Sequence, residues 1–413
     1  MESRHVEDQY QTEIVRQTRV TCFHIQVGNC AKCGKRIQGR DSRQTSDALG
    51  AAASQVGPEA LSLATILNKE LGMPLGKTTA VLDKAFGLTL TPGGLSQALA
   101  RLGKKCEPTY QDLISQVRMG PSVTMDESGW KVGGHPWWLW VAVTSDTTVY
   151  GILPGRGYKE AARLLGAGFD GFLVHDGWHI YNQFTAAFHQ TCTRHLINRC
   201  NEMLVTASSA TAAFPRHVKT ILLKGLDLRD RYAEGEISSH GLASAAGRLA
   251  ADMERLLAPH YRSPENQRFA KHLLHEYDRL FLYLNCPGLE ATNWRGEQAI
   301  RPAVVARKVW GGNRTENGAH GQTVSANCTW FKRAFGMGGD PSSLSSAPWS
   351  AFPGVQGVLY RRRRRVETWR AGRRKFHCPT GMDGLGCTFV PRLAGLSAAT
   401  ARSQLASGVG CLS

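Results

Sequence analysis

The order of apolar patterns between residues 119 and 204 constrains the fold of this 413-residue chain most strongly. Three runs rich in β-branched and aromatic residues come first, separated by turn residues as in a three-stranded meander: SVTMDESGW (122–130), WWLWVAVTS (137–145) and TTVYGILPG (147–155). A helix, two strands and a second helix are predicted next, over GYKEAARLLGAG (157–168), GFLVHDGW (171–178), FHQTCT (188–193) and RHLINRCNEML (194–204). This order indicates an α/β sheet domain.

Two of the predicted strands end in the same way. The first stops on Asp126 and the fourth on Asp176, and Gly-Trp follows each aspartate within a few residues. If these strands are neighbours, both carboxylates emerge at the same edge of the sheet. Close carboxylates repel and raise the pKa of one of them, unless a cation lies between them. Mg²⁺ suits such oxygen ligands, and with a third carboxylate, for which Glu297 is best placed, a site for two metal ions is predicted.

The same three acids have an ordinary structural explanation. Aspartate before glycine at a strand end, as at Asp176, is common turn chemistry. Glu297 is four residues before Arg301 and could pair with it on a helix surface. Pro302 also limits the helix that can be drawn through Glu297, because residues before proline avoid the helical region. Spacing alone therefore leaves both interpretations open.

The flanking regions are predicted to be helical. Within residues 44–118, Pro58 begins a helix, Gly87 ends a second and Thr91-Pro92 begins a third. Short helices joined by glycine turns fit either a helix-turn-helix DNA-binding region or a plain helical packing domain. Residues 205–290 carry apolar stripes at helical spacing, with a helix start at Ser263-Pro264, and predict a helical insertion within a sheet domain of residues 119–324.

The net charge of +17 favours a polyanionic partner, and nucleic acid fits best because Lys and Arg neutralise phosphates. Residues 325–413 hold 13 Lys and Arg against 3 Asp and Glu, including the run of five arginines at 361–365. This tail contributes +10 of the charge, so the argument is weaker for the preceding residues. No apolar period persists in the tail, and it is predicted to be disordered.

Composition also predicts a cytoplasmic protein without a membrane partner. The longest apolar run, at residues 137–143, is far too short to span a bilayer. The first ten residues lack the apolar segment of a signal peptide. Without such signals, the eleven cysteines are typical of reduced thiols or metal ligands.

Several long motifs resemble, in the same order, the core of transposases of the insertion sequence 66 family. They begin at VTMDESGW (123–130), GFLVHDGW (171–178), HQTCTRHLINRC (189–200) and ATNWRGEQAIRP (291–302), and the resemblance extends from about residue 10 to Val324. It implies a bacterial, nucleoid-associated enzyme with a ribonuclease H-like catalytic domain interrupted by a helical insertion. It also implies an Asp-Asp-Glu triad of Asp126, Asp176 and Glu297 that binds Mg²⁺ or Mn²⁺.

The resemblance extends to residues around the triad. Cys192 and His195 resemble a Cys-x2-His signature and would support the metal site, together with Asn293. The residues Arg301, Arg307, Lys308 and Arg314 would hold DNA phosphates. Ordinary alternatives are a half-buried thiol, a histidine at a helix N-terminus and a solvated basic helix face. Trp130 and Trp178 could stack on bases, although core packing is the commoner role of tryptophan.

The two ends of the chain carry further expectations. Cys30 and Cys33 of CAKCGK resemble one knuckle of a zinc-ribbon-like segment over residues 1–43. Structural Zn²⁺ needs four ligands, and only Cys22 and His24 lie nearby to complete them. At the other end, the sequence after Val324 departs from the aliphatic helical segment of the family. We interpret this change as a shift of the reading frame near Val324.

Together these features predict a Mg²⁺-dependent transposase that cuts element ends and joins the freed 3′-hydroxyl to target DNA. It would act as a homo-oligomer on DNA, with accessory proteins of the same element as further partners. Two alternatives stay open: a catalytically inactive DNA-binding remnant and a ribonuclease H-like nuclease without strand transfer.

Overall fold

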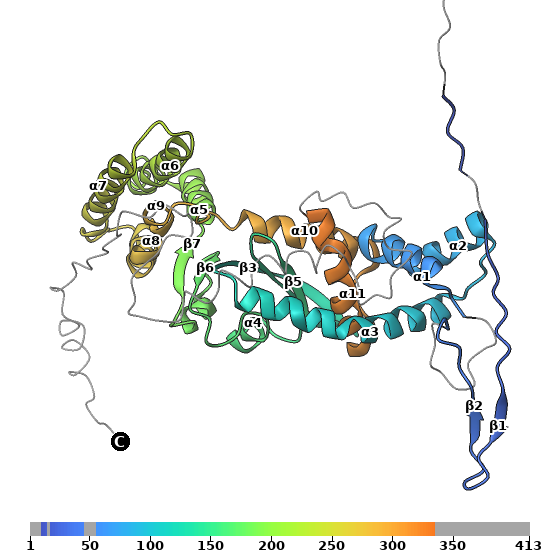
Figure 1. Cartoon of the computed structure of the whole chain (residues 1–413). Coiled ribbons are helices and arrows are strands. Elements are labelled where there is room, and N and C mark those ends of the chain that lie inside the picture. Colours follow the sequence, from blue (N-terminus) through green and yellow to red (C-terminus); the bar gives the residue numbers. More distant parts are fainter. Residues whose placement is uncertain (1–9, 15–16, 45–54, 335–413) are drawn as a thin grey trace, which may run out of the picture.

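The structure is a computed structural model that describes residues 10–14, 17–44 and 55–334 (Figure 1). A mixed sheet of five strands, in the order β5-β4-β3-β6-β7, lies at the centre of these residues. The strands are β3 (Ser122–Val132), β4 (His135–Val143), β5 (Thr148–Leu153), β6 (Phe172–His175) and β7 (Phe188–Thr191). The pairs β3–β4 and β4–β5 are antiparallel, whereas β3–β6 and β6–β7 are parallel. The predicted meander and the two later strands are confirmed.

The alternation of side chains along β3 gives the sheet two different faces. Val123 and Met125 point into a core shared with the helices α1 (Pro58–Thr65), α2 (Leu75–Phe86), α3 (Pro92–Arg118) and α4 (Tyr158–Leu165). Trp130 and Val132 point into a second core, shared with α10 (Trp294–Trp310) and α11 (Glu316–Ala334). Successive residues of a strand face opposite sides, so Asp126 lies on the α10 side of β3 and Glu127 on the other.

The helices before the sheet pack on one another and on α11, and α3 makes their main contact with the sheet, at β5. They are α1 (Pro58–Thr65), a π-helical turn (Ile66–Glu70), α2 (Leu75–Phe86) and α3 (Pro92–Arg118). Gly87, with φ +66°, ends α2 as predicted, and the Thr91 hydroxyl caps α3 by accepting from Gly94 N at 3.0 Å.

Helix α3 is much longer than the sequence predicts and continues through Pro108. A proline inside a helix costs about 3 kcal/mol, and here the burial of one face of α3 offsets that cost. Leu95, Leu99 and Leu102 lie in the core shared with the sheet. The Tyr110 hydroxyl donates to Tyr150 O of β5 at 2.9 Å. This face of α3 is therefore covered by β5 together with α11.

The segment predicted as a helical insertion, residues 205–290, lies to one side of the sheet, and its core includes Val174 of β6 (Figure 1). Helix α4 (Tyr158–Leu165) connects β5 to β6, whereas the insertion comes after β7 and the helix α5 (Thr193–Thr206). It consists mainly of α6 (Ala213–Ala233), α7 (Ser239–Leu257), α8 (Pro264–His275) and α9 (Leu282–Asn285). The Ser263 hydroxyl caps α8, which begins at Pro264 as the sequence predicts. None of the helices in the described ranges is both long enough and apolar enough to span a membrane.

The chain returns to the sheet through α10 (Trp294–Trp310) and α11 (Glu316–Ala334). The expectation that Pro302 would limit the helix through Glu297 is wrong, because α10 continues past it. The small residues Ala299 and Ala303 are buried between α10 and the sheet, and this close packing stabilises the helix across the proline.

The region expected to lack structure from residue 325 begins inside a helix. Helix α11 continues to Ala334, and its side chains cover the free edge of β5. Tyr150 N donates to Asn327 Oδ1 at 2.8 Å, and Ile152 N donates to Thr323 Oγ1 at 3.1 Å. Edge strands need such partners for their backbone groups. The rest of the predicted basic tail, residues 335–413, lies outside the described residues.

The Asn327 contact predicts a stability change. Asn327→Ala should lower the free energy of unfolding by about 1–3 kcal/mol, because the buried Tyr150 N–H loses its acceptor. Urea denaturation measures this. Asn317→Ala, at an exposed position of the same helix, is the control and should stay within about 0.5 kcal/mol of the parent. Equal effects at both positions would contradict the role given to Asn327.

Candidate active site

Asp126 and Asp176 lie at one edge of the β3–β6 pair. Asp176 directly follows β6, as the sequence predicts. Asp126 is two residues beyond Thr124, the last residue of β3 that pairs with β6. The expectation that the first strand ends on Asp126 is wrong, because β3 continues to Val132 beside β4. The neighbouring strand β6 ends instead, so Asp126 has no strand partner on the side where Asp176 emerges.

The electrostatics of Asp126 are those of a carboxylate crowded by other acids. Burial raises the pKa of Asp126 to about 7, and the negative charges of Glu127 and Asp176 add to the increase. A hydrogen bond from Glu127 N to Asp126 Oδ1, at 2.9 Å, opposes it. Burial is therefore the main cause of the raised pKa, and the neighbouring acids act in the same direction.

Glu297 approaches this edge from the first turn of α10. Its neighbour Gly296 packs against Asp126 so closely that a Cβ at residue 296 would lie 2.9 Å from the Asp126 Cβ. The Glu297 side chain is 50% exposed, and its Oε1 lies 3.9 Å from His195 Nε2. The start of α10 is therefore anchored on β3, while the Glu297 carboxylate itself faces solvent and His195.

His195 is the cation of this group. A hydrogen bond with Cys192 raises the pKa of His195 to about 9, and the charges of Asp176 and Glu297 act in the same direction. At neutral pH the imidazole is therefore protonated and partly offsets the repulsion among the acids. The predicted supporting pair, Cys192 and His195, thus lies beside two of the three predicted triad residues.

Cys192 and Asn293 link the helical insertion to α10. Cys192 is fully buried, and its Sγ accepts a hydrogen bond from Asn293 N at 3.1 Å. The Asn293 side chain is also fully buried, yet neither of its amide atoms has a hydrogen-bond partner among the described residues. Buried amides are nearly always paired, so the Asn293 side chain is an exception at this junction.

The donor chemistry of the acidic edge fits a divalent cation. Carboxylate oxygens are the ligands that Mg²⁺ and Mn²⁺ take, and a bound cation would favour the charged form of Asp126. Within the described ranges, however, no group of three or more His, Cys, Asp and Glu side chains is arranged to hold a metal ion. The Glu297 carboxylate is directed toward His195 rather than toward the two aspartates.

Glu127 is a fourth acid that the sequence analysis overlooked. Its side chain is only 1% exposed and lies on the face of β3 opposite Asp126. Arg156 donates to Glu127 Oε1 at 2.8 Å, and the Tyr181 hydroxyl donates to Oε2 at 2.8 Å. The Arg156 guanidinium lies between two indole rings, 4.8 Å from Trp138 and 4.2 Å from Trp178. The adjacent Asp126-Glu127 pair in a strand pattern was the available signal, because alternation must send the two acids to opposite faces.

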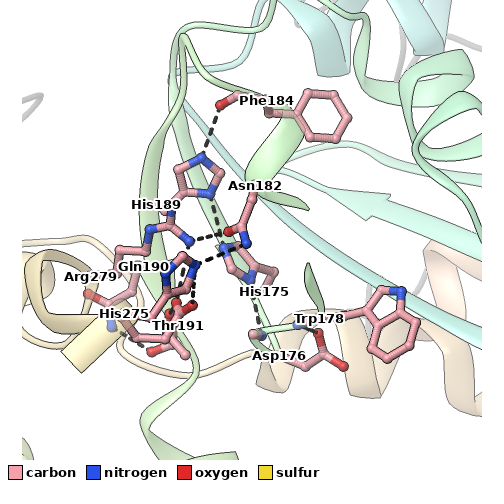
Figure 2. A network of polar contacts seen from close by, with 12 residues as sticks. His175, Asp176, Trp178, Asn182, Phe184, His189, Gln190, Thr191, His275 and Arg279 are labelled. Carbon is pink, nitrogen blue, oxygen red and sulfur yellow. Dashed lines mark hydrogen bonds and ion pairs between the residues drawn. The ribbon is translucent and has the colours of Figure 1, made fainter. Parts of the chain in front are cut away.

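A second overlooked feature is a buried histidine pair behind Asp176 (Figure 2). Gly177 N donates to His175 Nδ1 at 3.0 Å, so the proton of the neutral ring lies on Nε2. That N–H donates to His189 Nδ1 at 3.0 Å, and His189 Nε2 donates to Phe184 O at 3.0 Å. Burial lowers the pKa of both histidines, which keeps them neutral. The pair fixes the turn after Asp176, where Trp178 N also donates to Asp176 Oδ1 at 2.8 Å.

The basic residues predicted to contact DNA differ in their placement. Arg301, Lys308 and Arg314 are exposed. Arg307 instead turns toward β3, where it donates to Ser128 Oγ at 3.1 Å and to Gly129 O. Trp130 is buried, and its Nε1 donates to Asn313 Oδ1 at 2.8 Å, which matches the core alternative.

The cysteines near the N-terminus lie in a small hairpin. Cys30 and Cys33 are in the turn between β1 (Val27–Asn29) and β2 (Arg36–Gln38), where hydrogen bonds from the backbone of Cys33 and Lys32 lower the pKa of Cys30. Cys22 and Cys33 are exposed. Together with His24 they form no three-ligand group among the described residues, so a zinc site here stays a prediction.

Asp126 makes stability depend on pH. Its folded pKa of about 7 lies above the ordinary aspartate value of about 3.9, so the folded state favours the protonated carboxyl. The associated stability is complete below about pH 4 and is lost as the pH rises toward 7. Asp126→Asn should therefore raise the free energy of unfolding at pH 8, by up to the order of 4 kcal/mol, and change it little at pH 4. Denaturation at both pH values checks this, with the exposed Asp112→Asn as control; a gain at pH 4 as large as that at pH 8 would contradict it.

Arg156 should matter through the charge of Glu127. Arg156→Ala leaves a buried carboxylate without its cation and should cost about 3–5 kcal/mol of unfolding free energy. Adding Glu127→Gln should recover most of the loss, because the uncompensated charge is then gone. Chemical denaturation of the two single variants and the double variant gives the coupling energy. Additive effects would show that the pair is not coupled.

A family model described as Transposase IS66 family matches residues 53–321, which is more than half of the chain and includes the sheet, the helical insertion and α10. A search of curated proteins found no match. The resemblance noted from the motifs is confirmed, and the chain belongs to the IS66 family of transposases.

Proposed function

We propose that the protein is a DNA transposase that cleaves the ends of its element and transfers the 3′-hydroxyl strand to target DNA. Membership of a transposase family supports DNA transposase activity in general. The observation that carries the finer proposal is the meeting of Asp126 and Asp176 beyond the end of the β3–β6 pairing. The first turn of α10 adds Glu297 to the same edge.

The sheet supports a ribonuclease H-like catalytic domain. Three antiparallel strands are followed by two strands parallel to the first, and the helical insertion enters after the last strand. In this arrangement the first strand is central and the fourth is its neighbour. Side chains from both can therefore act on one substrate.

Asp126, Asp176 and Glu297 would hold Mg²⁺ or Mn²⁺. When bound, the metal ions would supply charge neutralisation for the attacking and leaving oxygens of a phosphodiester. The chain's own contribution is position: β3 and β6 fix the two aspartates, and Gly296 fixes the approach of α10. Glu297 must turn from His195 toward the aspartates, which its exposed side chain permits.

Two reactions use this site in turn. In cutting, the oxygen of water bonds to phosphorus and the bond from phosphorus to the 3′-oxygen breaks, so the 3′-oxygen leaves as a hydroxyl. In joining, that hydroxyl bonds to a target phosphorus and the corresponding target bond breaks. Positioning and charge stabilisation provide most of the catalysis in such transfers.

The surrounding residues have supporting roles in this proposal. Cys192, His195 and Asn293 would position the start of α10 and balance the charge of the acids. Arg301, Lys308 and Arg314 are exposed and would contact DNA phosphates. Arg307 would act indirectly, by holding α10 to β3.

The triad predicts a loss of both reactions. Asp126→Asn, Asp176→Asn or Glu297→Gln should reduce cleavage and joining by at least about 100- to 1000-fold, with binding to element-end DNA retained. A strand-transfer assay in Mg²⁺ and in Mn²⁺ measures the two products. Glu202→Gln, at an exposed position of α5, is the matched control. Unchanged activity in any triad variant would refute the assignment.

The same assay separates the alternatives. Cleavage without joined products would favour a nuclease. Binding of element ends without cleavage would favour an inactive remnant, an alternative suggested by the departure of the sequence from the family after Val324. A homo-oligomer on DNA, accessory proteins of the element and zinc at Cys30 and Cys33 stay predictions.

A further inference from the structure

A small hollow lies at the tip of the β3–β4 hairpin, away from the acidic edge. It measures about 280 Å³ and is lined by Lys131, Gly133, Gly134 and residues 310–314. Its size is close to the lower end of ligand pockets, roughly 300 Å³. The motifs of the proposed active site use none of its glycines.

The hollow is built by two chain segments that are locked together. Asn313 N donates to Lys131 O and Gly133 N donates to Asn313 O, both at 2.9 Å. At Gly312, with φ +137°, a Cβ would lie 2.4 Å from Lys131 O, so only glycine permits this approach. Trp310 forms one wall and packs edge-to-face on buried Trp130, with 5.7 Å between ring centroids. The hollow is therefore preformed.

Helix α10 connects the acidic edge to the hollow. It contacts β3 at Asp126 through Gly296, at Gly129 through Arg307 and at Lys131 through the Gly312 turn. The helix thus begins beside Asp126 and ends at the hairpin tip. From Glu297 to Trp310 the distance along the helix is roughly 20 Å, at about 1.5 Å per residue.

The solvent face of α10 carries positive charge along this path. Glu297, Arg301, Val305 and Lys308 follow at spacings of three and four residues, and all four are exposed. Lys131 and Arg314 are exposed at the rim of the hollow. The four cations are Arg301, Lys308, Lys131 and Arg314, and none of them forms an ion pair with a described residue. Exposed cations beside an aromatic wall are the features that bind single-stranded nucleic acid.

We propose that the hollow binds one unpaired nucleotide of the DNA, with its base against Trp310 and its phosphate held by Lys131 and Arg314. The strand reaches it from the acidic edge along Arg301 and Lys308. The site takes any base, because stacking on an indole ring does not select sequence. This inference rests on the proposed function, since it makes the hollow a second contact for the same substrate.

The test measures binding of the full chain to a labelled 20-nucleotide oligothymidylate and to a matched duplex. EDTA is present, so that cleavage does not enter. Trp310→Ala should weaken single-strand binding about tenfold or more and duplex binding much less, whereas Trp310→Phe should retain most of the affinity. Lys131→Ala and Arg314→Ala should each reduce the salt slope of binding by about 1.

Lys224→Ala, at an exposed position of α6, is the charge control and should leave the slope unchanged. Equal losses for single strand and duplex in Trp310→Ala, or no loss, would overturn the inference. So would no affinity of the parent protein for the single strand. If Trp310→Ala unfolds, the two exposed cation variants still decide the outcome. If Trp310→Ala loses single-strand binding but the parent protein never cuts DNA, the proposed function is refuted, whereas the nucleotide site in the hollow is retained.

Discussion

The candidate site depends on the unequal lengths of the two strands that flank β3. The parallel neighbour β6 stops pairing at Thr124, whereas the antiparallel neighbour β4 continues to Val132. Asp126 is therefore held rigidly by one partner and left open on the side of the other, where Asp176 emerges. A strand that ended at Asp126 would leave this side chain on a loop, with far less positional control. Firm positioning of this kind is what a catalytic carboxylate requires.

The second constraint is the packing of α10 along β3. Glycine at residue 296 and alanines at 299, 303 and 306 let the helix approach the sheet closely, and Arg307 fastens it near Gly129. This contact gives α10 a buried face and a solvent face. The solvent face starts at Glu297 and continues through Arg301 and Lys308 toward the hairpin tip. One helix thereby joins the acidic edge to the basic surface that we propose for DNA.

Much of the fold was predictable because the relevant signals are local. Alternating β-branched and aromatic residues predicted the meander, and Ser263-Pro264 and Gly87 marked helix ends. The length of α3 and the course of α10 past Pro302 were not predictable, because burial against the sheet outweighs the local preference of proline. Within the site, the strand pattern was enough to predict that Asp126 and Asp176 lie at one edge of the sheet. The partners of Glu127 and Arg156 and the pairing of His175 with His189 could not be predicted, since these contacts join residues that are not neighbours in the sequence.

The order of strands and helices and the likeness to the family follow from the residues alone, because each rests on patterns within short windows or on motifs in a fixed order. The fold was needed to show which strand stops beside Asp126, that Arg156 and Tyr181 are the partners of Glu127, and that Arg307 packs inward against β3. The physical reason is that strand register and helix packing are set by contacts between distant segments. Those contacts select one of several arrangements that the local patterns permit equally.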